Sequence, residues 1–209
     1  MKNLAQNRQK KSNASLATRK PCEGVVRIVS GLFRKTPIKV LDLEGLRPTP
    51  NRVRETFFDW IFHFLGGCEE KSVCDMFSGS GALGIEAASR GATRILAIEK
   101  NRKAAQSIKD VVLRLNATDR VEVLCADAFA ALMSSEEEFD IFFIDPPFAS
   151  HLQLKALEVA KAHLNETGLV FLESDTEITA ETFEAARFAL LRQSKAGNEW
   201  FFVLKPLFP

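Results

Sequence analysis

Between residues 72 and 173, short apolar runs alternate with longer amphipathic stretches. The short runs predict strands at residues 73–77, 94–99, 121–126, 139–145 and 169–173. The amphipathic stretches predict helices at residues 82–90, 102–115, 128–134 and 151–164. This alternation predicts an α/β fold whose parallel sheet has right-handed crossovers and binds ligands at the carboxyl ends of its strands.

The two ends of the chain follow other patterns. Residues 25–30 and 38–41 predict a small hairpin, and Thr49-Pro50 predicts the start of a helix whose apolar face runs from Val53 to Leu65. Residues 183–204 predict a helix and then two strands, paired as a hairpin of 187–192 with 200–204. The expected organisation is a disordered basic tail (1–22), an N-terminal hairpin and helix extension (23–67), and a main domain (68–209).

Composition narrows the class of protein. The chain has 209 residues, of which 46% are hydrophobic and 26% charged, as in a soluble domain. It shows no 18-residue apolar run and no apolar signal region near Met1. Four cysteines without a C-x-x-C pair and three histidines argue against a disulfide framework or a metal site. We expect a reduced, cytoplasmic, monomeric protein without a membrane segment.

Charge is distributed unevenly along the chain. Residues 1–54 hold 13 Lys/Arg and 3 Asp/Glu, a net charge of +10, whereas residues 55–209 hold 15 and 24, a net charge of −9. In the basic part, arginines such as Arg34, Arg47, Arg52 and Arg54 interleave with apolar residues. This pattern favours a nucleic-acid surface attached to an acidic domain.

A glycine-rich turn follows the first strand of the main domain. Asp75-Met76-Phe77-Ser78-Gly79-Ser80-Gly81-Ala82-Leu83-Gly84 contains G-x-G-x-x-G, and Glu99 ends the next strand. Both features also occur in dinucleotide-binding oxidoreductases that use NAD. However, the carboxylate of Asp75 would repel an incoming pyrophosphate, whereas it would attract an ammonium or sulfonium group.

S-adenosylmethionine is a ligand of that cationic kind. The glycines allow the backbone to approach it closely, and Glu99 has two oxygens that can accept from both ribose hydroxyls. Asp127 ends the third strand and is placed to accept from the adenine amino group, although capping of the following helix would also explain it. With Phe77, Lys100 and Ala128, these residues are the candidate cofactor site.

The fourth strand runs into Asp145-Pro146-Pro147-Phe148, where two prolines fix the backbone. An exocyclic amine on a nucleobase is a poor nucleophile unless its N–H groups are held. Asp145 and the Pro146 carbonyl can accept those N–H groups, and Phe148 offers a ring on which an unstacked base can lie. The motif therefore predicts methyl transfer to an amino group of a flipped base, with no metal.

Three segments together resemble the bacterial 16S rRNA guanine-N2 methyltransferase family, RsmD. They are residues 75–91, residues 145–148 and residues 46–60, and the last includes R-P-T-x-x-R-V-R-E-T-x-F, which begins at Arg47. The resemblance implies a Rossmann-like class I S-adenosylmethionine-dependent fold of seven strands, mostly parallel, with helices on both faces. It also implies methylation of the 2-amino group of one guanine within the small ribosomal subunit or an assembly intermediate.

The resemblance assigns roles to particular residues. Asp75, Gly79, Gly81, Glu99 and Asp127 would hold the cofactor, and Asp145, Pro146 and Phe148 would hold the base, while Arg34, Arg47, Thr49, Arg52 and Arg54 would face the RNA. The residues alone leave other readings open: adenine-N6 or protein-glutamine methylation at a similar site, an NAD-dependent oxidoreductase, and a non-enzymatic RNA-binding protein.

Overall fold

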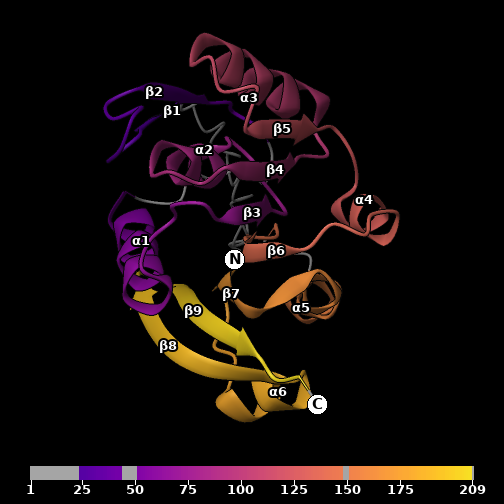
Figure 1. Cartoon of the computed structure of the whole chain (residues 1–209). Coiled ribbons are helices and arrows are strands. Elements are labelled where there is room, and N and C mark those ends of the chain that lie inside the picture. The colour runs from indigo at the N-terminus through magenta and orange to yellow at the C-terminus, as the bar shows by residue number, and fades with distance from the viewer. Residues whose placement is uncertain (1–23, 44–50, 148–150, 209) are drawn as a thin grey trace, which may run out of the picture.

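The computed structural model describes residues 24–43, 51–147 and 151–208. Its centre is a seven-stranded sheet in the order β5-β4-β3-β6-β7-β9-β8, which runs from the top to the bottom of Figure 1. The strands β3 to β7 are parallel, and β9 is antiparallel to both of its neighbours. Their bounds are β3 Ser72–Asp75, β4 Arg94–Ile98, β5 Val121–Leu124, β6 Phe139–Ile144, β7 Leu164–Ser174, β8 Phe188–Ala196 and β9 Glu199–Pro206.

Helices cover both faces of the sheet (Figure 1). One face carries α1 (Asn51–Leu65), α2 (Ala82–Ser89) and α3 (Arg102–Arg114), and the other carries α4 (Ala128–Met133), α5 (Gln153–Ala162) and α6 (Ala180–Ala185). Each face has its own hydrophobic cluster, because side chains of successive strand residues point to opposite faces. No helix in the described ranges is long and apolar enough to cross a bilayer.

The predicted α/β fold is confirmed, and the sheet has the seven, mostly parallel strands that the resemblance implies. The strands from β3 to β6 and the four helices between β3 and β7 lie within a few residues of the expected ranges. The C-terminal part differs more. Strand β7 begins at Leu164 rather than 169, where Leu164 pairs with Phe139, and α6 precedes the expected helix start at 183. The predicted hairpin is present, but β8 continues to Ala196 through exposed polar residues that pair by their backbone.

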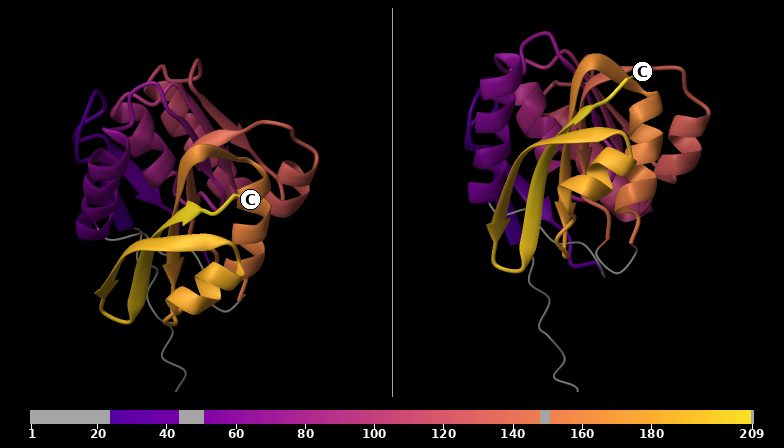
Figure 2. Two further views of the ribbon diagram at one scale, coloured as in Figure 1. Left: turned by 60° about the horizontal axis from the view of Figure 1, so that its bottom comes forward. Right: turned by 90° about the horizontal axis from the view of Figure 1, so that it is seen from below.

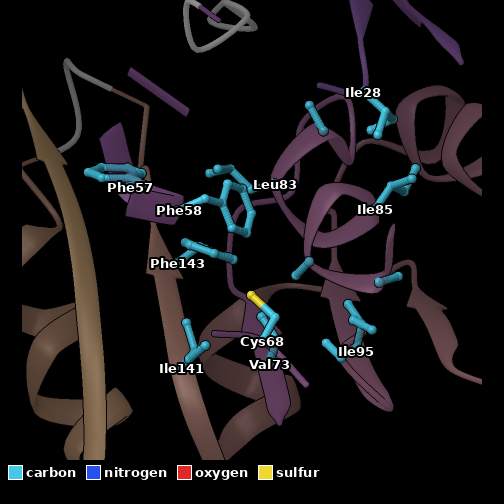
Figure 3. Close-up of a cluster of buried hydrophobic side chains, with 14 of the residues drawn as sticks. Ile28, Phe57, Phe58, Cys68, Val73, Leu83, Ile85, Ile95, Ile141 and Phe143 are labelled. Carbon is cyan, nitrogen blue, oxygen red and sulfur yellow. The ribbon is translucent and has the colours of Figure 1, made fainter. Parts of the chain in front are cut away.

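The N-terminal extension packs against α2 and shares its core. The strands β1 (Gly24–Arg27) and β2 (Pro37–Val40) form an antiparallel hairpin, and their inward residues join the cluster on the α2 face. Figure 3 shows Phe58 of α1 and Leu83 of α2 close to Phe143 of the sheet, and the ring centres of Phe58 and Phe143 lie 5.9 Å apart. The extension is thus built into the hydrophobic core, whereas the predicted tail 1–22 lies outside the described residues.

Candidate active site

Asp75 is the last residue of β3 and is only 3% exposed. Its Oδ2 accepts the backbone N–H of Gly84 at 3.1 Å, which links the strand to the first turn of α2. The pKa of Asp75 is raised to about 7, chiefly by burial; the Gly84 hydrogen bond opposes this shift, and the negative charges of Asp145 and Glu99 contribute to it. The three carboxylates therefore share one electrostatic environment at the carboxyl ends of β3, β4 and β6.

The glycine turn gives backbone access beside these acids. Gly79 and Gly81 have φ values of 54° and 76°, in the left-handed region that favours glycine. A Cβ atom at Gly81 would lie 2.9 Å from Cγ2 of Ile108, so the turn also packs tightly on α3. Gly81 precedes α2 and has no side chain with which to cap it, so within the first turn the N–H of Gly84 is bonded by Asp75 instead.

Glu99 follows β4 and binds the turn directly. Its Oε2 accepts the backbone N–H of Gly79 at 2.8 Å, and its Oε1 accepts that of Asn101 at 2.6 Å. Asn101 in turn caps α3 through its side chain. Each Glu99 oxygen retains a second lone pair, so the side chain can hold the turn and still accept from a ligand.

Asp127 performs the capping role that the sequence left open. Its Oδ1 accepts from the backbone of Phe129 and Ala130 at the start of α4, and its Oδ2 lies 3.1 Å from Nζ of Lys100. The Lys100 hydrogen bond lowers the pKa of Asp127. Ala128 is buried, and the Phe77 and Phe129 rings meet edge to face 6.0 Å apart. Because Lys100 is the chain neighbour of Glu99, its ion pair with Asp127 connects the segments that follow β4 and β5.

Asp145 and Pro146 follow β6, the strand next to β3. Phe143 of β6 pairs with Asp75 of β3, so Asp145 lies two residues beyond the position on β6 that is level with Asp75. Asp145 is half-buried, Pro146 buried and Pro147 exposed, while Phe148 lies outside the described residues. The described residues also hold no group of three or more His, Cys, Asp or Glu side chains suited to a metal ion.

The structure overturns the RNA-facing role expected for Arg54. Its side chain is 0% exposed, and Nη2 donates to the Arg27 carbonyl and to Oδ1 of Asn51, both at 2.7 Å. Burial lowers the pKa of Arg54, and the negative charges of Glu86 and Glu55 counteract that shift. A guanidinium enclosed in this way is structural, because it has no surface to offer to a phosphate.

The other basic residues fall in different places. Arg52 is exposed in the first turn of α1, and Arg34 is exposed in the loop between β1 and β2. That loop contacts the C-terminal end of α2, where the Leu32 N–H donates to the Ser89 carbonyl. Arg34 is thus separated from the glycine turn by the length of α2, about 12 Å for eight residues. Arg47 and Thr49 lie outside the described residues.

Sequence reasoning missed Glu86, a fully buried acid of α2. Its two oxygens accept the backbone N–H groups of Val29 and Ser30 at 2.7 and 3.0 Å, and Oε1 also accepts from Nε of Arg90 at 2.9 Å. Nη1 of Arg54 lies 3.8 Å from Oε2. A signal was present, because Glu86 is the only charged residue in an otherwise small and apolar helix.

This geometry can be compared with known proteins. Residues 26–205 match the family model described as Conserved hypothetical protein 95. Ribosomal RNA small subunit methyltransferase D of Buchnera aphidicola is 37% identical over 156 residues, which cover 73% of this chain and 78% of the relative. The chain belongs to this RsmD family. The resemblance drawn from the motifs is therefore confirmed, and membership in a methyltransferase family decides against the NAD-dependent reading.

Solved structures agree with this assignment. The structure of yhhF from Escherichia coli superposes with a TM-score of 0.76 at 31% identity, covering 89% of this chain and all of that chain. SMU.776, solved in complex with SAH, has a TM-score of 0.61 at 17% identity and covers 77% of this chain and 50% of its own. The second comparison supports the fold alone. The RsmD-family chain thus has the class I methyltransferase fold, with its strand-end acids at the edge where that fold binds ligands.

Proposed function

We propose that this chain methylates the N2 amino group of a guanine in 16S rRNA, with S-adenosylmethionine as the methyl donor. Family membership supports methylation of ribosomal RNA as the general activity. The observation that carries the proposed chemistry is the grouping of Asp75, Glu99 and Asp145 at the ends of three neighbouring strands. The choice of guanine N2 rests on the resemblance of residues 46–60 and 145–148 to the family motifs.

The residues of the glycine turn fit a cationic cofactor. A buried carboxyl group whose pKa has risen to about 7 is stabilised in its charged form by a nearby ammonium or sulfonium group, and destabilised by a phosphate. Asp75, Gly79 and Gly81 would hold the methionine part, Glu99 the ribose, and Asp127 the adenine amino group, with Phe77, Lys100 and Ala128 around them. Bound there, S-adenosylmethionine supplies an electrophilic methyl group on its sulfonium sulfur.

The chain's own residues would orient the acceptor. Asp145 accepts one N–H of the guanine amino group and the Pro146 carbonyl accepts the other, so the nitrogen lone pair is directed away from both. The Asp145 carboxylate also stabilises the positive charge that develops on the nitrogen before a proton is lost. Phe148 would support the base by stacking. Positioning and electrostatics together account for the proposed catalysis.

The substrate would reach this site as a flipped or looped-out nucleotide, because a stacked base cannot enter between a glycine turn and a proline elbow. Arg52 in the first turn of α1 is a proposed RNA contact, as are Arg47 and Thr49 earlier in the chain, and Arg34 is a more distant one. We expect the chain to act as a monomer on the small subunit or an assembly intermediate.

The test is a methyl-transfer assay with small-subunit RNA and assembled subunits from cells that lack this protein. Labelled S-adenosylmethionine reports transfer, and mass spectrometry identifies the modified nucleotide. Asp145→Ala should slow transfer by about 10²–10⁴-fold, while calorimetry should show nearly unchanged affinity for S-adenosylhomocysteine. Glu136→Ala, which changes an exposed acid far from the site, serves as the matched control.

Each outcome has a clear meaning. Label on the N2 atom of a guanine, lost in Asp145→Ala and kept in Glu136→Ala, would support the proposal. Label on adenine or on a protein glutamine would show that the acceptor is not guanine N2. Full activity of Asp145→Ala would refute the mechanism. Binding of RNA without any transfer would favour a non-enzymatic role.

A further inference from the structure

We propose that the end of the β8–β9 hairpin, centred on Lys195 and Trp200, is a second RNA-contacting surface that binds the strand beside the target nucleotide. The inference rests on the proposed function and adds a surface that the family motifs do not include. Both views in Figure 2 show the connected ends of β8 and β9 at the opposite end of the sheet from the C-terminus.

Sheet register places this surface level with the acceptor site. Ile144 of β6 pairs with Leu172 of β7, so Pro146 and Ser174, each two residues further along, lie at the same level of the sheet. Ser174 pairs with Trp200, and Trp200 pairs with Lys195. Neighbouring strands are about 4.8 Å apart, and β9 and β8 are the second and third strands from β6. Trp200 therefore lies about 10 Å, and Lys195 about 14 Å, from the line of β6 that leads to Pro146. That span is a few nucleotides at about 3.4 Å each.

The chemistry of the pair suits a single RNA strand. Nζ of Lys195 lies 4.6 Å from the centre of the Trp200 ring, and that ring lies nearly parallel to the Phe202 ring, with 10° between their planes. Trp200 is half-buried, whereas Lys195 is exposed. An anchored aromatic ring with a cation beside it is the combination with which proteins bind unpaired bases and their phosphates.

Local charge favours the same partner. Residues 187–198 contain Arg187, Arg192 and Lys195 and no acid, although residues 55–209 as a whole are acidic. The preceding segment, residues 173–184, contains five acids and no base. A polyanion would therefore be attracted to the hairpin and repelled by the exposed acids Glu177, Glu181 and Glu184 around α6; of the other two acids, Glu173 is buried and Asp175 follows Ser174 at the end of β7.

Charged residues on β8 also have a simpler explanation. Strand β8 is at the edge of the sheet, where lysine and arginine commonly prevent pairing with another chain. The two explanations differ in the sign of charge that they require. Any charge protects an edge, but only a positive charge binds RNA. A charge reversal at Lys195 therefore separates them.

The experiment compares Lys195→Glu with Lys109→Glu, which makes the same change of net charge on the exposed side of α3. RNA affinity of each full-length variant, saturated with S-adenosylhomocysteine, is measured by fluorescence anisotropy at several salt concentrations. We expect Lys195→Glu to weaken binding at least about fivefold and to reduce the salt slope by about one. Lys109→Glu should change affinity less than twofold.

A second variant tests the ring. Trp200→Leu keeps an apolar side chain against Phe202 but removes the stacking surface, and it should raise KM for RNA about fivefold or more with kcat and cofactor affinity retained. Equal RNA affinity of Lys195→Glu and Lys109→Glu, or an unchanged KM in Trp200→Leu, would overturn this inference. If the variants give that result while the wild-type protein still methylates guanine, the inference fails and the proposed function stands. If the wild-type protein transfers no methyl group, the proposed function itself is refuted.

Discussion

Helix α2 meets the glycine turn at its N-terminal end and the loop between β1 and β2 at its C-terminal end. At the first end the cap residue is Gly81, and the buried carboxyl group of Asp75, which accepts from Gly84, has a raised pKa. At the second end, Glu86 and Ser89 bind four backbone groups of residues 29–33 through their side chains. One end leaves polar groups available to a ligand, and the other uses them to fix the extension. Variants at the two ends should therefore separate ligand binding from stability.

The largest effect is expected for Glu86→Ala. This change leaves the buried Arg54 without its neighbouring charge and two half-buried N–H groups without an acceptor. We expect the free energy of unfolding to fall by about 3–5 kcal/mol, measured by urea denaturation. Glu122→Ala removes an exposed partner of Arg94 and should cost less than about 1 kcal/mol. Similar losses in the two variants would contradict the role of Glu86.

Alanine substitutions of two glycines compare the ends directly. A Cβ atom at Gly31 would lie 1.8 Å from the Ser89 carbonyl oxygen, whereas one at Gly81 would meet the side chain of Ile108, which can shift. Gly31→Ala should lower the free energy of unfolding by about 2–4 kcal/mol, and Gly81→Ala by about 1–2 kcal/mol. Calorimetry should show that only Gly81→Ala weakens cofactor binding, by about tenfold or more. The reverse ranking for cofactor affinity would contradict the assignment of the two ends.

Asp75→Asn should change how stability depends on pH. In the wild type the folded pKa is about 7 and the ordinary value is 3.8, so the folded state binds the proton more tightly. Stability is therefore lost as pH rises from 4 to 7, by at most about 4 kcal/mol. The variant lacks this loss, so without cofactor it should melt at a higher temperature than the wild type at pH 8.

The same variant should bind S-adenosylmethionine more weakly, because the cationic ligand loses its buried partner. Thermal melting at pH 5 and pH 8, with and without S-adenosylmethionine, measures both effects, and the difference between variant and wild type removes the contribution of other titrating groups. Parallel pH profiles for the two proteins would show that Asp75 does not titrate as described.

The smallest effect is expected for Asp127→Asn. Asparagine also caps helices, and the lost ion pair with Lys100 is exposed, so the free energy of unfolding should change by less than about 0.5 kcal/mol. Isothermal titration should show a smaller loss of cofactor affinity than in Asp75→Asn. A loss larger than that of Asp75→Asn would make Asp127 the main cofactor ligand.

The sheet from β3 to β6 was predictable because each strand is a compact apolar run followed by a helix of regular period. Parallel pairing then required the acids after these strands to meet at one edge. The second half of β8 was not predictable, because Gln193 to Ala196 is exposed and mostly polar and forms a strand by backbone pairing with β9. Its strand structure depends on a partner rather than on its own side chains.

The error at Arg54 has a different cause. Its position in a basic segment suggested an exposed side chain, yet Arg54, Phe58 and Ile61 follow the same i, i+4, i+7 stripe and all are buried. Helical phase was therefore a better guide than charge. The compensating acid, Glu86, is 32 residues further along, and no local pattern links the two.

The attachment of the extension to α2 also has a consequence for synthesis of the chain. Ser30 leaves the ribosome 59 residues ahead of Ser89, its hydrogen-bond partner. At a synthesis rate of about 5–20 residues per second, about 3–12 s pass between synthesis of the loop after β1 and synthesis of the helix that binds it. Until then the inward apolar side chains of the nascent hairpin have no core to enter, and chaperones have that interval in which to bind them.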